Sequence, residues 1–283
     1  MVGVYVDEET RAVESLPRGV SRGVRPLDRR SNRRVARAAA RHGLESELEL
    51  ARVVQQQFLP RNTKSLATIR IAAAYVPAGK IGGDYYDFLD LGPQSLGFTV
   101  ADVSGKGIAA ALLVANLQAS VRSECVRGFR DLLPMLERIN AHFFQATLPE
   151  QYATAFFGQY DDSTRRLRYV NCGQQPAILI RNSGFLERLK TTALPLGVID
   201  RWNGEEEAVE LRPGDTLCVC SDGVVEAGID IGEEFGEQGL ISILKACQHR
   251  DVQVAVSCVV DKTCEHRLGG TTDDVTVVAI RSV

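Results

Sequence analysis

Residues 153–171 read ATAFFGQYDDSTRRLRYVN, and this stretch decides the fold class. It contains two short runs of β type, Ala153–Tyr160 and Leu167–Asn171, which the turn residues Asp161-Asp162-Ser163-Thr164 join directly. Two such runs separated by so short a polar turn predict a β-hairpin, and the strands of a hairpin pair antiparallel. The stretch therefore favours an antiparallel sheet over the parallel sheet of a βαβ protein.

Similar runs lie on both sides of the hairpin. Two long helical patterns interrupt them, at about residues 108–127 and 131–147, and shorter helices are expected after Gly239 and up to about His266. Hairpins mixed with inserted helices predict an α+β fold, an antiparallel sandwich covered by helices. The further β-type runs, each bounded by Gly, Pro, Asn or Asp, are Ile69–Tyr75, Leu96–Ala101, Ala177–Arg181, Thr216–Cys220 and Val275–Arg281.

The bulk composition is that of an ordinary globular protein. The chain has 283 residues, 45% hydrophobic and 24% charged, with a net charge of −3. Its 7 cysteines show no CxxC spacing, which favours buried, reduced thiols in a cytosolic protein. No apolar run approaches the ~20 residues that span a bilayer, and the first residues lack the pattern of a signal peptide. We therefore expect a cytoplasmic protein without a membrane partner.

Arginines gather near the N-terminus. Residues 1–43 combine them with Pro and Gly and show no apolar periodicity, which predicts a weakly ordered tail or linker. The run Arg18–Arg41 could bind nucleic acid or another polyanion through its charge. It has no interleaved aromatic residues and no recognisable motif. A solvated tail is therefore the favoured interpretation, and nucleic acid is an unlikely partner.

A helix is expected between this tail and the strands. Within residues 44–60 it should run from about Leu44 to Phe58, and its apolar face includes Leu48. A face of this kind must be buried against the rest of the chain or against a second copy. Residues 61–283 then form the main domain, which holds the strands and the remaining helices.

Four aspartates stand out because each lies beside glycine or small residues at the end of a β-type run. Carboxylates in such places leave room for a hard cation and its waters. Two unit charges 4 Å apart repel by about 4 kcal/mol at an effective dielectric of 20, so a cluster of them requires cations. A single Asp-Gly after a strand is usually only a turn, so spacing alone leaves both interpretations open. The four are Asp84 in Gly82-Gly83-Asp84, Asp102 in Ala101–Gly107, Asp222 in Ser221-Asp222-Gly223, and Asp273 in Thr272–Thr276.

Taken together, these segments resemble the PPM-type (protein phosphatase 2C-like) serine/threonine phosphatases, in particular the SpoIIE/RsbU subgroup. The resemblance covers roughly residues 45–283, and the segments follow the family's order. It implies an α-β-β-α four-layer sandwich, two antiparallel sheets flanked by helices, in agreement with the strand pattern. The matching stretches are Glu49–Pro60, Pro77–Phe88, Asp102–Ala111, Leu194–Gly197, Gly214-Asp215 with Ser221–Gly223 and Glu226, and Asp273–Thr276.

The resemblance also implies a centre with two divalent cations, manganese or magnesium. Asp102 would bridge both cations, and the backbone carbonyl of Val103 would bind one of them. Asp222 and Asp273 would complete the shell of the other cation, while Asp84 would hold the second directly or through water. A water activated by the two cations would then attack phosphorus.

Three positions qualify this assignment. Asp274 is the less expected ligand of its pair, because the family places the metal-binding aspartate three residues before the threonine. Gln174 stands where the family often has a histidine, which predicts an altered substrate contact rather than lost catalysis. No counterpart of the phosphate-binding arginine of eukaryotic relatives is recognised. Lys106 is a candidate for this role, although an exposed structural lysine is the commoner explanation.

The predicted function is a metal-dependent phosphatase of a phosphoserine or phosphothreonine protein. In the resembling subgroup the usual substrate is an anti-sigma factor antagonist, which implies a role in bacterial signalling or stress control. Further expected partners are an upstream sensor or activator, and a second copy bound through the 44–60 helix, where Leu48 and Phe58 would serve regulation. Two alternatives are a non-catalytic module of the same fold and a nucleic-acid-binding protein that uses Arg18–Arg41.

Overall fold

The computed structural model describes residues 29–60, 63–126, 131–267 and 273–283. Contacts divide the chain into two units, Met1–Glu45 and Ser46–Val283. The second unit holds all the strands, and the fold and the site described below belong to it.

The strands of the described residues form two five-stranded sheets in which every neighbouring pair is antiparallel. The first sheet has the order β1 (Ile69–Val76), β10 (Val275–Ser282), β9 (Thr216–Cys220), β6 (Ala177–Ile180), β7 (Leu186–Leu189). The second has the order β2 (Asp84–Asp90), β3 (Ser95–Val103), β4 (Ala153–Asp161), β5 (Arg166–Cys172), β8 (Glu207–Glu210).

The predicted hairpin is confirmed as β4–β5. Its strands pair from Phe156 opposite Asn171 down to Asp161 opposite Arg166. The Asp161 carboxylate accepts the backbone N–H groups of Ser163 (2.9 Å) and Thr164 (3.0 Å), which closes the turn. This side-chain bond to the following backbone explains why an aspartate opens the turn sequence.

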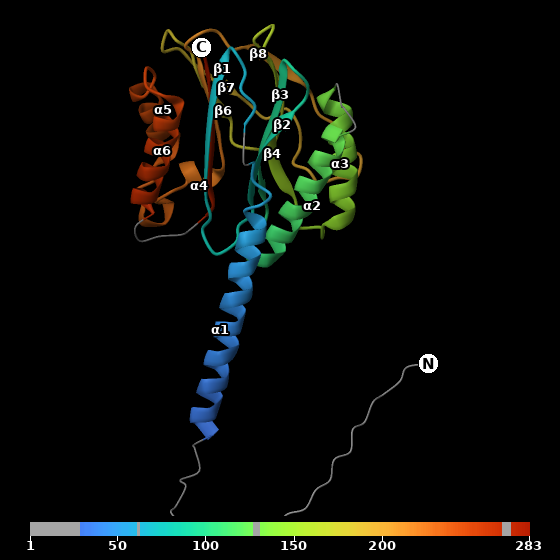
Figure 1. Ribbon diagram of the computed structural model, residues 1–283, viewed down its shortest axis with the longest axis vertical. Helices are drawn as coiled ribbons and strands as arrows, with labels where there is room; N and C mark the ends of the chain where they lie inside the picture. Colours follow the sequence, from blue (N-terminus) through green and yellow to red (C-terminus); the bar gives the residue numbers. More distant parts are fainter. Residues whose placement is uncertain (1–28, 61–62, 127–130, 268–272) are drawn as a thin grey trace, which may run out of the picture. The chain divides into compact units, whose positions relative to one another are not determined.

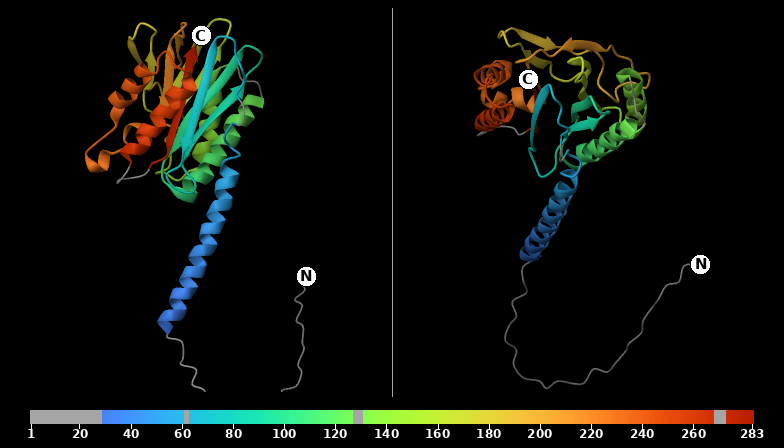
Figure 2. Two further views of the ribbon diagram at one scale, coloured as in Figure 1. Left: turned by 60° about the vertical axis from the view of Figure 1, so that its left-hand side comes forward. Right: turned by 45° about the horizontal axis from the view of Figure 1, so that its top comes forward.

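Helices cover the outer faces of the two sheets (Figure 1). Helices α2 (Gly107–Val126) and α3 (Leu132–Ala146) pack on the second sheet, whereas α4 (Asp222–Val225), α5 (Gly236–Ala246) and α6 (Val252–His266) pack on the first. The turned views of Figure 2 keep the two groups on opposite sides of the sheets. A short 3₁₀ helix, Ile229–Ile231, follows α4. The helix predicted at about residues 108–127 is confirmed as α2, and Ala110, Leu113, Val114, Leu117 and Val121 form its buried stripe.

Three buried clusters of apolar side chains hold the layers together. The middle cluster lies between the sheets, where Phe156 stacks on Phe98 and Tyr169 with ring centroids 5.9 and 5.3 Å apart. The other two clusters lie between each sheet and its helices. Because both faces of both sheets are covered, the predicted α-β-β-α sandwich is confirmed.

Helix α1 (Arg29–Gln55) is longer at its start and shorter at its end than the helix predicted from Leu44 to Phe58. The early start follows from arginine and alanine, which have high helix propensity. The prediction instead inferred a weakly ordered tail from the Pro and Gly residues between Pro17 and Pro26, and these residues all precede the helix. At the other end, the Phe58 N–H still reaches the Gln55 carbonyl at 2.9 Å, so Phe58 lies in a tight turn after the helix.

The arginine-rich run falls largely outside the described part of the chain. Residues 1–28 lie outside the described chain, as do the side chains before Arg41, so the weakly ordered tail over 1–28 and the polyanion alternative stay predictions. Over 29–43 the backbone belongs to α1, so the weakly ordered tail predicted for 1–43 does not extend over these residues. All 7 cysteines are free thiols. Within the described residues, no helix combines the length and apolar character that crossing a membrane requires.

Candidate metal centre

Asp84 and Asp102 face each other across the β2–β3 ladder. Asp84 is only 2% exposed, and its carboxylate accepts the Thr276 hydroxyl of β10 at 2.6 Å. Burial, and then the charge of Asp102, raises the pKa of Asp84 well above its ordinary value. The register of two neighbouring strands thus places two carboxylates side by side in a poorly solvated position, where both are costly to ionise.

Asp222 and Asp273 reach the same region from the first sheet. Asp222 begins α4 directly after β9, and Asp273 precedes β10, the strand paired with β9. The two segments approach so closely that a Cβ at Gly223 would lie 2.1 Å from the Asp274 carbonyl oxygen, so only glycine fits there. Burial, and then the charge of Asp273, raises the pKa of Asp222.

The carboxylates of the two sheets interact. Burial, followed by repulsion from Asp222 and Asp273, raises the pKa of Asp102 to about 7. The structure therefore brings all four predicted aspartates to the edge where the sheets meet. No three His, Cys, Asp or Glu side chains of the described residues are close enough, as they stand, to hold a metal ion together. The roles of the four aspartates as metal ligands stay predictions.

The donors and the space around them fit a hard divalent cation. A Cβ at Gly83 would lie 2.8 Å from the carbonyl oxygen of Val103, so glycine leaves this predicted donor uncovered. The Tyr75 hydroxyl lies 2.2 Å from where a Cβ of Gly82 would be, and it is buried without a hydrogen-bond partner among the described residues. Carboxylate and carbonyl oxygens are the ligands that hard cations prefer.

Asp274 has a structural position instead. Its carboxylate accepts the backbone N–H groups of Ala78 (2.6 Å), Gly83 (2.5 Å) and Asp84 (3.2 Å). It thereby fixes the loop that leads into β2 and orients Asp84. This use of its oxygens by the backbone agrees with the expectation that Asp273, rather than Asp274, is the ligand.

Gln55 is a contact that the sequence did not reveal. This buried side chain at the end of α1 donates to the carbonyl of Gly82 at 2.7 Å, and accepts the Gly82 N–H at 3.0 Å. The predicted regulatory residues Leu48 and Phe58 are only half-buried. In the sequence, the available signal was that Gln55 is the one polar residue in the otherwise apolar row Leu44, Leu48, Ala51, Gln55 and Phe58. An amide there can bond to backbone, which an apolar side chain cannot.

Lys106 and Gln174 flank the aspartates in different ways. Lys106 lies in the β3–α2 loop, where Gly105 and Gly107 have positive φ angles, and its Nζ is 3.1 Å from Asp273 Oδ2. Gln174 is 4% exposed and accepts the Thr154 hydroxyl at 2.6 Å. Its burial speaks against the substrate contact expected for it, because its amide is bonded inside the protein.

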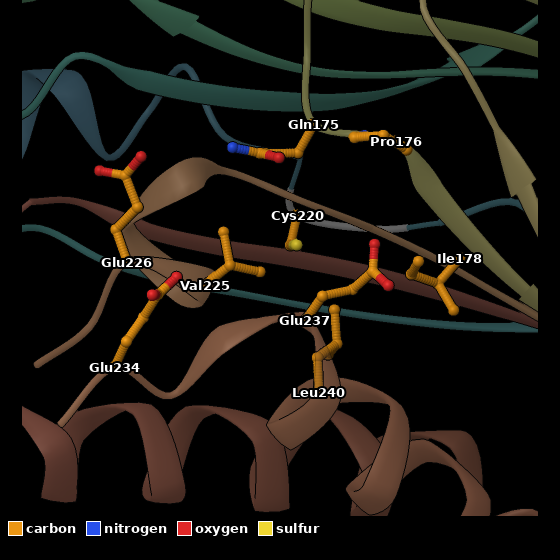
Figure 3. A pocket seen from close by; sticks show the side chains of 9 residues that line it. All are labelled: Gln175, Pro176, Ile178, Cys220, Val225, Glu226, Glu234, Glu237 and Leu240. Atoms are coloured by element: carbon orange, nitrogen blue, oxygen red, sulfur yellow. The ribbon is translucent and has the colours of Figure 1, made fainter. Parts of the chain in front are cut away.

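Glu226 lines two cavities, and the second of them is also lined by Asp273. The first, of about 190 Å³, has an apolar floor with carboxylates around it. Its lining residues, labelled in Figure 3, are Gln175, Pro176, Ile178, Cys220, Val225, Glu226, Glu234, Glu237 and Leu240. The second, of about 220 Å³, is lined by Lys106, Gly223, Glu226, Ala227, Ile229, Asp230, Arg267 and Asp273.

Comparisons with known proteins agree with this architecture. Protein IcfG of Synechocystis sp. is 27% identical over 262 residues, which are 83% of this chain and 41% of that protein. Phosphoserine phosphatase RsbU of Bacillus subtilis is 28% identical over 191 residues, 67% of this chain and 56% of that protein. The chain thus spans about half the length of these curated relatives.

The fold is shared with a solved structure, the SiaA-PP2C domain of Pseudomonas aeruginosa. The TM-score is 0.75 at 21% identity, with 86% of this chain and 98% of that chain covered. The resemblance to PPM-type phosphatases is thereby confirmed at the level of the fold. Residues 92–283, about two thirds of the chain, match the family model for Stage II sporulation protein E. The chain therefore belongs to the Stage II sporulation protein E (SpoIIE) family.

Proposed function

We propose that the chain is a metal-dependent phosphatase that hydrolyses a phosphoserine or phosphothreonine protein. The observation that carries this proposal is the meeting of two pairs of aspartates, Asp84 with Asp102 and Asp222 with Asp273, at the edge shared by the sheets. The name of the relative RsbU, a phosphoserine phosphatase, supports the reaction class. A non-catalytic module would have no use for carboxylates that raise one another's pKa.

The cofactor that we propose is a pair of divalent cations, manganese or magnesium. Asp102 would be shared between them, Asp222 and Asp273 would hold one, and Asp84 and the Val103 carbonyl would hold the other. When bound, such cations neutralise the carboxylates and supply a nucleophilic water at neutral pH. Structures of the same fold are described as a magnesium complex of RsbX and a complex of PstP with 2 manganese ions, which supports this choice.

The protein's own residues would fix the geometry of this centre. Thr276 holds Asp84 by a hydrogen bond, and the β2–β3 ladder fixes the distance between the backbones of Asp84 and Asp102. Gly83 keeps the Val103 carbonyl uncovered. Positioning of this kind is the main contribution of a protein to phosphoryl transfer, because little covalent chemistry is required of its side chains.

The substrate class and the regulation are part of the proposal. By the resemblance, the phosphoprotein would be an anti-sigma factor antagonist in bacterial signalling or stress control. An upstream sensor, or a second copy of the chain, would act through the 44–60 helix. Apolar side chains on this helix support such a contact, because Leu50 is 67% exposed and Val54 is 57% exposed. The Gln55–Gly82 bonds connect the helix to the loop that carries Asp84.

The test is hydrolysis of p-nitrophenyl phosphate and of phosphoserine peptides by the purified chain, with manganese, with magnesium and with excess EDTA. We expect turnover only with a cation, together with a higher melting temperature in its presence. Undiminished turnover in EDTA would refute the metal dependence. No turnover on any of these substrates, by a folded and manganese-saturated protein, would refute the phosphatase.

A further inference from the structure

Arg267 has a buried guanidinium nitrogen beside the aspartates. The residue caps the C-terminal end of α6 and lines the cavity of about 220 Å³, together with Lys106 and Asp273. Its nitrogen Nη2 is buried and has no hydrogen-bond partner among the described residues. Leaving a buried donor unsatisfied costs about 1–3 kcal/mol, and more for a charged group. Native proteins retain few such groups, so this one requires an explanation.

Other arginines of the described chain show how unusual this is. Arg122 forms a pair with Asp87, Arg138 with Glu124, and Arg181 with Glu187. The other buried side-chain atoms without a partner in the described residues are hydroxyl oxygens, on Tyr75, Thr99 and Thr263. Among these atoms, Nη2 of Arg267 alone belongs to a cation. A ligand that carries negative charge would satisfy it.

The position of Arg267 limits which anion this is. The cavity is lined by Asp273, whose carboxylate is 3.1 Å from Lys106 Nζ, so the cavity borders the proposed metal centre. The cavity also contains the carboxylates of Glu226 and Asp230. These carboxylates would repel a free anion. A phosphoryl group would also be attracted by the cations proposed at Asp273, and this attraction would offset the repulsion. Arg267 and Asp273 line the same cavity, so a phosphoryl group held by cations at Asp273 would be bound on the cavity that the guanidinium lines.

We propose that Arg267 binds the phosphoryl oxygens of the substrate and serves as the phosphate contact for which the sequence offered only Lys106. A guanidinium presents paired N–H donors that match phosphate oxygens, and these charge-assisted bonds are about twice as strong as neutral ones. The inference rests on the proposed function. It implies that phosphate binds in the presence of manganese and that Arg267 contributes to its affinity.

The experiment uses the full chain and inorganic phosphate as the probe. Calorimetry measures the phosphate Kd of the manganese-loaded wild type, Arg267→Ala, Arg267→Lys and the control Arg212→Ala. Arg212 is 70% exposed and lies outside this cavity. We expect at least a tenfold weaker phosphate Kd in Arg267→Ala, an intermediate value in Arg267→Lys, and the wild-type value in the control. The KM for p-nitrophenyl phosphate should rise in parallel.

A merely structural role makes different predictions. Removing an unpaired buried donor should leave the manganese Kd unchanged and the melting temperature unchanged or higher, whereas removing a structural arginine would lower the melting temperature. An equal phosphate Kd in Arg267→Ala and wild type overturns the inference. So does a variant that loses stability while its phosphate Kd stays the same. If Arg267→Ala does not fold, an unchanged phosphate Kd in Arg267→Lys and in Arg267→Gln overturns the inference equally.

The failure of the inference and that of the proposed function are distinguishable. Phosphate binding that depends on Arg267, in a protein without turnover, supports this inference and refutes the phosphatase. Turnover with manganese, combined with a phosphate Kd that does not depend on Arg267, supports the phosphatase and refutes this inference.

Discussion

Strand β2 carries two buried carboxylates with opposite surroundings. Asp87 is fully buried and accepts two N–H groups of the Arg122 guanidinium, at 2.8 and 3.0 Å. Asp84 is 2% exposed, accepts the hydroxyl of Thr276, and faces the negative charge of Asp102. Because side chains alternate along a strand, Asp87 points to α2 whereas Asp84 points to the edge where the sheets meet.

The difference teaches how a structural carboxylate is told from a functional one. A buried charge requires a partner, since the loss of hydration otherwise exceeds any gain. The partner of Asp87 is supplied by the protein. Asp84 and Asp102 have no lysine or arginine at ion-pair distance within the described part of the chain, and the cations proposed above would neutralise them. The residue type and the strand are the same, and the surroundings decide the role.

Removing one carboxylate of the uncompensated pair should have the largest effect. We expect Asp102→Asn to lower manganese-dependent turnover at least a hundredfold, because the proposed shared ligand of both cations is lost. The circular dichroism spectrum should stay that of the wild type. Asp222→Asn should behave in the same way. If either variant turned over at the wild-type rate, the aspartate that it replaces would not belong to the proposed centre.

Removing the compensated carboxylate should instead affect stability. Asp87→Asn leaves Arg122 without its charge partner, and breaking a buried pair from one side costs about 3–5 kcal/mol. Because Arg122 is 48% exposed, we expect the lower end of this range, measured by urea unfolding. Turnover per folded molecule should be nearly unchanged. Glu265→Gln, in an exposed pair with Lys262, is the control and should cost less than about 1 kcal/mol.

The pH dependence of stability sharpens the same contrast. The pKa of Asp102 is raised to about 7 in the folded protein, from an ordinary value of 3.8. Between these values the metal-free folded state holds a proton that the unfolded chain has released, so its stability falls as pH rises from about 4 to about 7. Melting curves in chelator should show this fall, and Asp102→Asn should weaken it. Parallel curves for the two proteins would contradict the assignment.

The smallest effect is expected at the end of α1. Gln55→Ala removes two hydrogen bonds to Gly82 and should cost about 1–3 kcal/mol. If the helix controls the loop before Asp84, the manganese Kd should also weaken severalfold. Leu48→Ala should lower stability and weaken the manganese Kd to a lesser degree, because Leu48 is half-buried. Leu50→Ala is the control, because Leu50 is exposed. A loss of melting temperature with unchanged manganese Kd would make the helix merely structural.

Much of the fold could be predicted because its central strands are apolar and bounded by turn residues. Strand β9, Thr216–Cys220, was predicted with its observed bounds. Strand β2 was missed because its sequence, DYYDFLD, places acidic residues within the apolar pattern. Strands β7 and β8 were missed because each has only 4 residues with charged side chains among them. Strand β8 forms because the longer strand β5 offers its free edge, which is tertiary information. Strand β7 pairs with β6, the equally short strand that precedes it.

The residues of the site could likewise be predicted only in part. The four aspartates could be found because each lies beside small residues at the end of a strand run. Arg267 could not be found, and Gln55 gave only the signal of a polar residue in an apolar stripe, because their significance depends on what lies next to them after folding. A buried guanidinium nitrogen without a partner is visible only once the neighbours of Arg267 are known. The distinction between Asp84 and Asp87 was equally hidden, since Arg122 lies on another element.

The last strand has a consequence for how the protein is made. β10 is the only neighbour of β1 in the first sheet as described, and Asp274 just before it binds the N–H groups of Gly83 and Asp84, 191 and 190 positions earlier. During translation, β10 itself, Val275–Ser282, must leave the ribosome before this edge can close. A chain that terminates early lacks both Asp273 and the strand that orders the rest. Because Asp273 is one of the proposed ligands, we expect products released before this strand to have no turnover in the phosphatase assay.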